Sequence, residues 1–253
     1  MKVFLAGAET YIGVLEKFKH EKPYVLTSFF YAKKDLEDMI PYFGDFLLDS
    51  GAFTFCGSGK FDERTFDAYI ERYADFIKRN HVDKFFELDV DSITGYEKVV
   101  EYRERLQKLT NRQPIPVWHI SRGKEEFIRH CDEFPYVALG GYVAAIKASD
   151  PRQKMYINSY PWFIAEAHKR GTKIHGLGYT SIDGLKKHHF DSVDSTRWNC
   201  TRFGRIEFFN GQTMIVRDWR KENKRLKSEN SAKITELCFG EWLKFQKYAD
   251  MHL

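Results

Sequence analysis

The sequence predicts an α/β fold, a (β/α)₈ TIM-like barrel followed by a C-terminal hairpin and helix. Eight short apolar runs occur within the first 200 residues, and amphipathic stretches of helical period separate them. Several runs are continuously apolar, which is typical of parallel strands that are covered on both faces. Regular alternation of such strands with helices favours a closed barrel, and an open doubly wound sheet is the alternative. The eight runs are VFLA (3–6), YVLTSFF (24–30), DFLLD (45–49), KFFELDV (84–90), IPVWHI (115–120), YVALGG (136–141), KIHGLG (173–178) and FDSVD (190–194).

The stretches between these runs are predicted to be helices. Residues 62–80 carry apolar side chains at i, i+3, i+4 and i+7 spacing after Asp62, a capping residue type. A second helix is expected from a capping Ser159 to Gly171, because glycine commonly follows a helix C-terminus. Weaker helical patterns occur near 10–19, 33–40, 95–108, 124–133 and 181–188.

The chain beyond residue 200 follows a different pattern. Residues 205–216, RIEFFNGQTMIV, predict a hairpin that turns at Asn210-Gly211. A C-terminal helix is expected to place Ile234, Leu237, Trp242, Phe245 and Tyr248 on one side. Because the sequence has no clear linker or internal repeat, we expect one domain over 1–253, with the barrel in about 1–200 and an extension in about 201–253.

Composition limits the function classes without choosing among them. No apolar run of the 253 residues approaches the ~18 residues of a membrane span, and the start MKVFLAGAET becomes polar too soon for a signal peptide. The four cysteines, at positions 56, 131, 200 and 238, lack CxxC spacing, which favours a reducing cytoplasm over a disulfide framework. A net charge of +4 and a pI of about 8.7 are compatible with a polyanionic partner.

Polar residues recur where the predicted strands end. In a parallel barrel these ends meet at one face, where catalytic residues gather. Each residue alone has a structural explanation, since an Asp after a strand is commonly a helix cap or turn former and a glycine pair is common in turns. Recurrence at five or six ends favours a site. The residues are Asp49, Asp89, His119, Gly140, Gly141, Tyr142, His175, Asp191 and Asp194.

This residue set suits a planar ligand with several hydrogen-bond donors, such as guanine. One aspartate would accept from N1–H and the exocyclic amine, and Phe53 would stack on the ring. Glycine lets the backbone approach a flat ligand closely. A pair of carboxylates beside a glycosidic bond is the general arrangement for exchange at an anomeric carbon.

The motifs DSGAF, LDVD, VWH, ALGGY, HGLGYT and FDSVDSTR, in this order over about residues 45–198, resemble those of the tRNA-guanine transglycosylase superfamily. The resemblance implies a (β/α)₈ barrel and a covalent glycosyl-enzyme mechanism. It makes Asp191 the nucleophile, with Asp194 as the rival, and Asp49 the general acid/base. It further implies that Asp89 recognises guanine, that His119 contacts the base, and that Gly140, Gly141 and Tyr142 read its edge. Phe53 and His175 would sandwich the ring, and Arg197 would steady the charge at the nucleophile.

The chain departs from the tRNA enzymes in three respects, one of which is that VWHIS and GYVAA replace the family segments VQGG and GLxVGE, so the pocket for the 7-substituent is expected to differ. The chain is also shorter, and it lacks the C-x-C-x₂-C run and later histidine of their structural zinc site; Cys200, Cys238 and His252 have no metal-ligand spacing. We therefore expect neither zinc nor another cofactor. Short relatives without zinc resemble the DpdA-type transglycosylases of bacteria and phages, which exchange guanine in DNA for a 7-deazaguanine. The expected partners are DNA, with tRNA as the alternative, and a free base such as 7-cyano-7-deazaguanine.

A basic segment offers a surface for nucleic acid. Its cationic and aromatic side chains suit phosphate contacts and base stacking, although a solvated helix face explains them equally well. A non-catalytic nucleic-acid-binding barrel that uses this segment is a second alternative, and a hydrolase of free nucleosides is a third. The segment comprises Arg217, Trp219, Arg220, Lys221, Lys224, Arg225 and Lys227.

Overall fold

The computed structural model describes residues 1–52, 54, 63–140, 151–179, 181–218 and 228–253. Seven parallel strands form one sheet in the order β3-β2-β1-β7-β6-β5-β4. They are β1 (Lys2–Ala6), β2 (Tyr24–Ser28), β3 (Asp45–Asp49), β4 (Val117–Trp118), β5 (Tyr136–Leu139), β6 (Lys173–Gly176) and β7 (Ser192–Ser195).

Residues 85–86 occupy the eighth strand position, between β3 and β4, and close the barrel. Phe85 bridges Leu48 of β3, and Phe86 bridges Ile115 ahead of β4, both in parallel orientation. The predicted (β/α)₈ barrel is therefore confirmed. The strand predicted at 84–90 is present only as these two bridges. The chain leaves the sheet after them, and helix α5 (Asp91–Thr94) begins two residues after Asp89.

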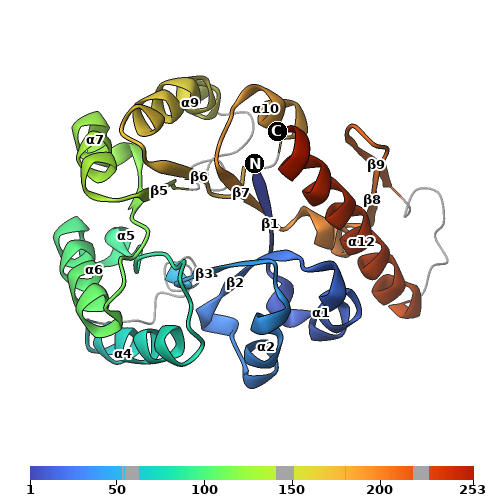
Figure 1. Cartoon of the computed structure of the whole chain (residues 1–253), viewed down its shortest axis with the longest axis horizontal. Coiled ribbons are helices and arrows are strands. Elements are labelled where there is room, and N and C mark those ends of the chain that lie inside the picture. Colours follow the sequence, from blue (N-terminus) through green and yellow to red (C-terminus); the bar gives the residue numbers. More distant parts are fainter. Residues whose placement is uncertain (53, 55–62, 141–150, 180, 219–227) are drawn as a thin grey trace.

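Helices surround the ring, as Figure 1 shows. The helices are α1 (Ile12–Phe18), α2 (Lys34–Met39), α4 (Glu63–Arg79), α6 (Tyr96–Thr110), α7 (Gly123–Glu133), α9 (Pro151–Lys169) and α10 (Ile182–Lys187). The prediction that Ser159 caps a helix is wrong, because α9 already begins at Pro151. Ser159 instead donates its hydroxyl to the carbonyl of Tyr156 inside the helix, at 2.6 Å. A serine satisfied in this way is tolerated in a helix interior.

The barrel interior changes character along the strands. At the N-terminal end Asp45 accepts hydrogen bonds from Lys2 and Lys84, each at 2.5 Å. An apolar layer follows, built from Phe4, Leu26, Leu47, Phe86 and Ala138. Because side chains alternate along a strand, the next inward positions lie at the C-terminal ends and carry Ser28, Asp49 and Asp194. The interior is thus closed by ion pairs at one end and lined with polar groups at the other.

The extension forms the predicted hairpin and helix. Strands β8 (Arg205–Phe209) and β9 (Met214–Asp218) pair antiparallel, and Asn210 Oδ1 accepts from the N–H groups of Gln212 and Thr213 in the turn. Helix α12 (Ser228–His252) packs against β1 and β8, and Figure 1 shows both termini on this side of the barrel.

The buried face of α12 differs in one position from the prediction. Trp242 and Phe245 are fully buried as expected, but Leu237 is 45% exposed. Leu237 precedes Trp242 by five residues, which places it roughly 140° around the helix axis. Cys238 and Phe239 occupy the buried face instead. Among the described helices, none is long and apolar enough to cross a bilayer.

Candidate active site

Asp49 ends β3 and faces the polar mouth of the barrel. Its Oδ2 accepts from the backbone N–H of Gly51 at 3.0 Å, a tight turn in which Gly51 has φ +82°. A side chain at position 51 would clash with Phe30 Cβ at 2.7 Å, which explains the glycine of the DSGAF motif. Burial, countered in part by the Gly51 N–H and reinforced by the charges of Asp194, Asp89 and Glu9, raises the pKa of Asp49 to about 6. A carboxyl group with this pKa can both donate and accept a proton near neutral pH.

Asp194 approaches the same mouth from β7. Its Oδ1 accepts from the backbone N–H of Gly178 at 2.7 Å, and His175 Nε2 lies 3.2 Å from the same oxygen. The side chain is 11% exposed. Oδ2 makes no hydrogen bond within the described part of the chain, so one oxygen of Asp194 is held and the other is available.

Asp191 does not join these carboxylates, and the expectation that it lies at the mouth is wrong. It precedes β7, and its carbonyl accepts from the N–H of Lys2 at the start of β1. Its Oδ2 accepts from Ile174 N at 2.8 Å and pairs with His168 of α9 at 2.9 Å. Because residues 191 and 194 have opposite parity on a strand, Asp191 points outward to the helices and Asp194 inward.

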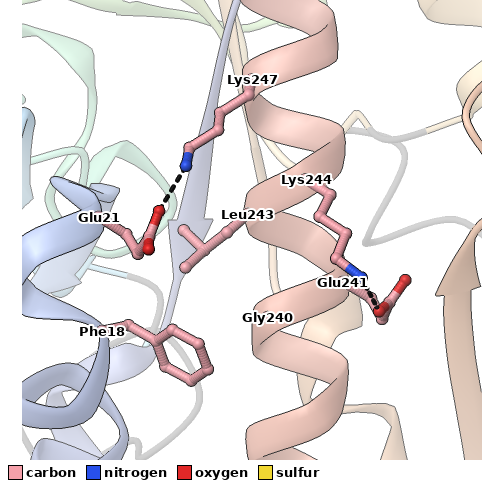
Figure 2. A pocket seen from close by; sticks show the side chains of 7 residues that line it. All are labelled: Phe18, Glu21, Gly240, Glu241, Leu243, Lys244 and Lys247. Carbon is pink, nitrogen blue, oxygen red and sulfur yellow. Dashed lines mark hydrogen bonds and ion pairs between the residues drawn. The ribbon is translucent and has the colours of Figure 1, made fainter.

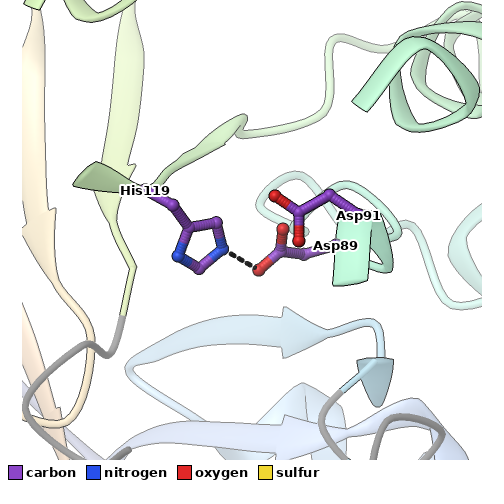
Figure 3. A group of neighbouring side chains, drawn as sticks. All are labelled: Asp89, Asp91 and His119. Atoms are coloured by element: carbon purple, nitrogen blue, oxygen red, sulfur yellow. Dashed lines mark hydrogen bonds and ion pairs between the residues drawn. The ribbon is translucent and has the colours of Figure 1, made fainter. Parts of the chain in front are cut away.

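Asp89 and His119 meet on the opposite side of the mouth (Figure 3). His119 Nε2 donates to Asp89 Oδ2 at 2.6 Å, and Arg122 donates to Asp89 Oδ1 and Asp91 Oδ2, both at 3.0 Å. Burial lowers the pKa of His119, but the hydrogen bond and the charge of Asp89 outweigh burial, so the pKa lies above its ordinary value. Sequence reasoning thus placed Asp89 and His119 together without identifying Arg122.

The same group contains the residues best placed to hold a metal ion among those described. One ligand atom from each of Asp89, Asp91 and His119 lies within 4.8 Å of the others. The guanidinium of Arg122, whose side chain is 3% exposed, already supplies positive charge to both carboxylates. A metal ion would therefore compete with a buried arginine for Asp89 and Asp91.

Gly140 supports this group by leaving space for it. A Cβ at Gly140 would lie 2.3 Å from His119 Nδ1 and 3.0 Å from the carbonyl of Trp118. Its own N–H donates to the Trp118 carbonyl at 2.7 Å, and its carbonyl accepts from Tyr156 at 3.4 Å. Both backbone groups of Gly140 are engaged within the protein, so its direct contribution is room for the His119 ring. Gly141 and Tyr142, predicted to read the base edge, lie outside the described residues, as does Phe53.

His175 lies inside the barrel, and the expectation that it forms one side of a ring sandwich is wrong. It has no exposed surface and its ring packs near Phe4 and Phe86, with centroids at 6.3 and 5.4 Å. Ile174 faces outward, so alternation along β6 turns His175 inward beneath the mouth. His175 contacts the site only indirectly, through its Nε2 beside Asp194 Oδ1.

Arg197 also differs from its predicted role. Its guanidinium donates to Glu207 Oε1 of β8 at 2.8 Å and lies over the Trp242 ring, 5.8 Å from the centroid. These contacts join the turn after β7 to the extension. Arg217 on β9 is described and exposed, whereas Trp219, Arg220, Lys221, Lys224 and Arg225 lie outside the described residues.

Three polar groups that sequence reasoning missed adjoin Asp49. Glu9 follows β1, Ser28 ends β2 directly beside Asp49, and Ser50 follows Asp49. Glu9 Oε2, Ser28 Oγ and Ser50 Oγ are buried and make no hydrogen bond with any described residue. Buried polar atoms are nearly always satisfied, so such atoms at a barrel mouth indicate a place for ligand or water. The strand-end rule would have found Glu9, which follows VFLA within three residues.

Two cysteines whose sequence spacing does not match a zinc motif, Cys200 and Cys238, lie close together in the fold. Cys200 Sγ and Cys238 Sγ lie 3.8 Å apart between the turn after β7 and α12. Among the described residues, no third His, Cys, Asp or Glu completes a ligand group with them. Two thiols supply half of the four ligands in a structural zinc site.

A pocket of about 330 Å³ lies between α1 and α12 (Figure 2). Its charged lining residues are paired, Lys247 with Glu21 and Lys244 with Glu241. Phe18 and Leu243 supply its apolar surface. None of the strand-end residues lines it, so the candidate active site is the barrel mouth.

Comparisons with known proteins bear on the fold. No family model and no curated protein matches the chain. Among solved structures, it is similar to that of a provisionally assigned fructose-1,6-biphosphate aldolase from Coccidioides immitis, with a TM-score of 0.53 and 12% identity. The match covers 99% of this chain and 89% of that chain. This likeness supports the barrel, and at 12% identity it carries no information on the reaction.

Proposed function

We propose that the protein is a base-exchange transglycosylase that replaces guanine in DNA with a 7-deazaguanine through a covalent aspartyl-glycosyl intermediate. The observation that carries the proposal is the convergence of Asp49, Asp89 and Asp194 from three separate strands, with Asp89 and Asp194 close enough to Asp49 for their charges to help raise its pKa. The ordered motifs over residues 45–198 support the same reaction. In this proposal Asp194 is the nucleophile, because Asp191 lies outside the barrel interior.

The reaction is a double displacement at C1′ of deoxyguanosine. Asp194 Oδ2 attacks C1′, the C1′–N9 bond breaks, and the electron pair leaves with guanine, which takes a proton from Asp49. The incoming base then gives its N9 proton to Asp49 and attacks C1′ through N9. The C1′–Oδ2 bond breaks, and its electron pair returns to the carboxylate of Asp194. Two inversions give net retention.

Asp89 recognises the base in this scheme. A carboxylate can accept from both N1–H and the exocyclic amine of guanine. Among the described residues each oxygen of Asp89 has one hydrogen-bond partner, His119 or Arg122, and each retains a second lone pair for the ligand. Because Arg122 and His119 hold the carboxylate from two sides, Asp89 presents a fixed edge. The target nucleotide must leave the base stack to reach it, at a cost of a few kcal/mol.

The polymer is the part of the proposal that depends most on the sequence. The sequence lacks the zinc run of the tRNA enzymes that its motifs resemble, and the basic segment at 217–227 supplies the positive charge that a phosphate backbone requires, so we propose DNA as the polymer. The incoming base is a free 7-deazaguanine, for which 7-cyano-7-deazaguanine is the first candidate.

A labelled-guanine exchange assay with the full chain tests the proposal. Double-stranded DNA, single-stranded DNA and tRNA are offered separately, and covalent adducts are detected on denaturing gels. Asp194→Asn should abolish both exchange and adduct, and Asp191→Asn, the same substitution three residues away, should keep the exchange rate within a few-fold of wild type. Exchange by the Asp194 variant would exclude it as nucleophile.

The polymers separate the remaining alternatives. Incorporation into tRNA alone would overturn DNA as the substrate and favour the tRNA enzyme. Binding to either polymer without exchange by the wild-type chain would overturn the transglycosylase and favour a non-catalytic barrel. Circular dichroism of each variant confirms that it is folded.

A further inference from the structure

A line of hydrogen-bonding side chains crosses the barrel interior beneath Asp194. Tyr136 on β5 hydrogen-bonds to Ser192 on β7, and Ser192 Oγ lies 2.5 Å from His175 Nδ1. His175 Nε2 in turn lies 3.2 Å from Asp194 Oδ1. His175 is 0% exposed and Ser192 is 2% exposed, so this part of the line is shielded from solvent, whereas Tyr136 is half-buried.

The direction of these hydrogen bonds follows from the end of the line. Burial raises the pKa of Tyr136 above its ordinary value, so the phenol keeps its proton, and because the Asp194 carboxylate at the other end of the line can only accept, we assign the phenol as the donor to Ser192 Oγ. The Ser192 hydroxyl, having accepted, directs its own proton to His175 Nδ1. An imidazole that accepts at Nδ1 carries its proton on Nε2, which faces Asp194.

We infer that His175 is a positioning residue for Asp194, fixed by Ser192 and Tyr136 as the tautomer that donates from Nε2 to Asp194 Oδ1. The inference rests on the proposed role of Asp194 as nucleophile. With Gly178 N–H and His175 Nε2–H both on Oδ1, the carboxylate cannot rotate, and Oδ2 faces the mouth.

The same contacts act on both half-reactions. In the first, a fixed Oδ2 meets C1′ in a productive geometry, and a misplacement of about 1 Å costs roughly 100-fold in rate. In the second, the negative charge that returns to Asp194 develops beside two donors already in position. An aspartate held in this way by a buried histidine parallels the orientation of a catalytic histidine by an aspartate, with the roles of the two groups reversed.

A purely structural role for His175 makes a different prediction. Its ring packs with Phe4 and Phe86, so a residue of the same shape without ring nitrogens would preserve that packing. His175→Phe is therefore the informative variant, and His175→Gln is its matched control because a glutamine amide can donate from a position near Nε2. Ser192→Ala removes the hydroxyl that selects the tautomer.

The experiment combines single-turnover kinetics with nitrogen NMR of the imidazole. We expect His175→Phe to slow adduct formation about 100-fold while the KM for the free base changes less than threefold, and His175→Gln to recover at least tenfold of that loss. Long-range ¹H–¹⁵N spectra of the wild-type chain, in which the His175 signals are assigned by comparison with the His175 variants, should show the Nε2–H tautomer. The Ser192→Ala variant should lose this tautomer preference.

The outcomes are distinguishable from failure of the proposed function. A folded His175→Phe variant with wild-type adduct formation, or an Nδ1–H tautomer in the wild type, would overturn the positioning role while leaving Asp194 as nucleophile. If the wild type exchanges no base, the spectra still test the hydrogen-bond line by itself. Wild-type rates in both His175 variants would assign His175 to packing alone.

Discussion

Asp191 and Asp194 are three residues apart in one short segment, yet they serve different parts of the barrel. Asp191 accepts from the N–H of Ile174 and pairs with His168 on the outer, N-terminal side of β7. Asp194 accepts from Gly178 N–H at the inner, C-terminal end. At about 3.3 Å per residue, three residues separate their Cα atoms by roughly 10 Å along the strand. Their consequences for stability and activity should therefore be opposite.

Asp191 is expected to contribute to stability and not to the reaction. Asp191→Ala removes the acceptor for Ile174 N–H and for His168, and should lower the free energy of unfolding by about 1 kcal/mol. Urea denaturation followed by circular dichroism measures this change. The exchange rate of the folded variant should stay within a few-fold of wild type, and a loss above 100-fold without unfolding would argue against a structural role.

Asp49 and Asp45, at the two ends of β3, should respond oppositely to the same substitution. The pKa of Asp49 is about 6 in the folded protein and 3.8 in the unfolded chain. The folded state therefore gains free energy from binding this proton, fully below pH 3.8, and loses that gain as the pH rises through 6. At pH 8, Asp49→Asn should therefore stabilise the protein by up to about 3 kcal/mol. Stabilisation at the expense of activity is common for catalytic groups.

Asp45 supplies the matched control. Burial alone would raise its pKa, but hydrogen bonds and charges from Lys2 and Lys84 outweigh burial and lower it. Asp45→Asn should lower the free energy of unfolding at pH 8, by about 1 to 3 kcal/mol, because two lysines lose their partner. Thermal melts of both variants from pH 4 to pH 8 test the pair. Equal effects of the two substitutions at pH 8 would contradict the assignment of opposite environments.

The two half-reactions should depend on pH in opposite directions. Adduct formation uses the protonated form of Asp49, so its single-turnover rate should fall above pH 6, toward tenfold per pH unit. Capture of the incoming base uses the carboxylate, so its rate should rise with pH and level off below about pH 6, because the esterified Asp194 no longer adds its charge to the causes that raise the pKa of Asp49. Isolated adduct, mixed with free base at each pH, separates the second step. In Asp49→Asn neither rate should show this dependence, and an unchanged profile would assign the proton transfer to another group.

Much of the fold could be predicted from the sequence because it depends on local patterns. Continuous apolar runs and helical spacing identify the staves and helices, and the polar residue that ends a run identifies the mouth. Register is different. FDSVD contains two aspartates, and only the pairing of Ser192 with Lys2 and Ser195 with Leu5 decides which one reaches the mouth. That pairing depends on β1, which lies far away in the sequence.

The inward orientation of His175 was hidden for a related reason. A histidine at the end of KIHGLG suits either a ligand stack or a buried hydrogen bond, and the sequence does not state which strands lie beside it. Its partners come from β7 and its ring neighbours from β1 and the 85–86 stave. Glu9 illustrates the opposite case, because it follows the first strand within three residues and its position is visible from the local sequence alone.

Gly140 should be essential because it makes room for His119 over Asp89. In Gly140→Ala the new Cβ would lie 2.3 Å from His119 Nδ1, so the ring must move and lose its 2.6 Å hydrogen bond to Asp89. We expect the Kd for the free 7-deazaguanine base, measured by calorimetry, to rise at least tenfold, with a smaller loss of thermal stability. His119→Ala should also weaken binding, because Asp89 loses one of the two groups that orient it. The double variant decides the cause: with the imidazole absent, adding Gly140→Ala should weaken binding little further. Fully additive losses would show that Gly140 acts through the nearby Trp118 carbonyl or the backbone instead of through His119.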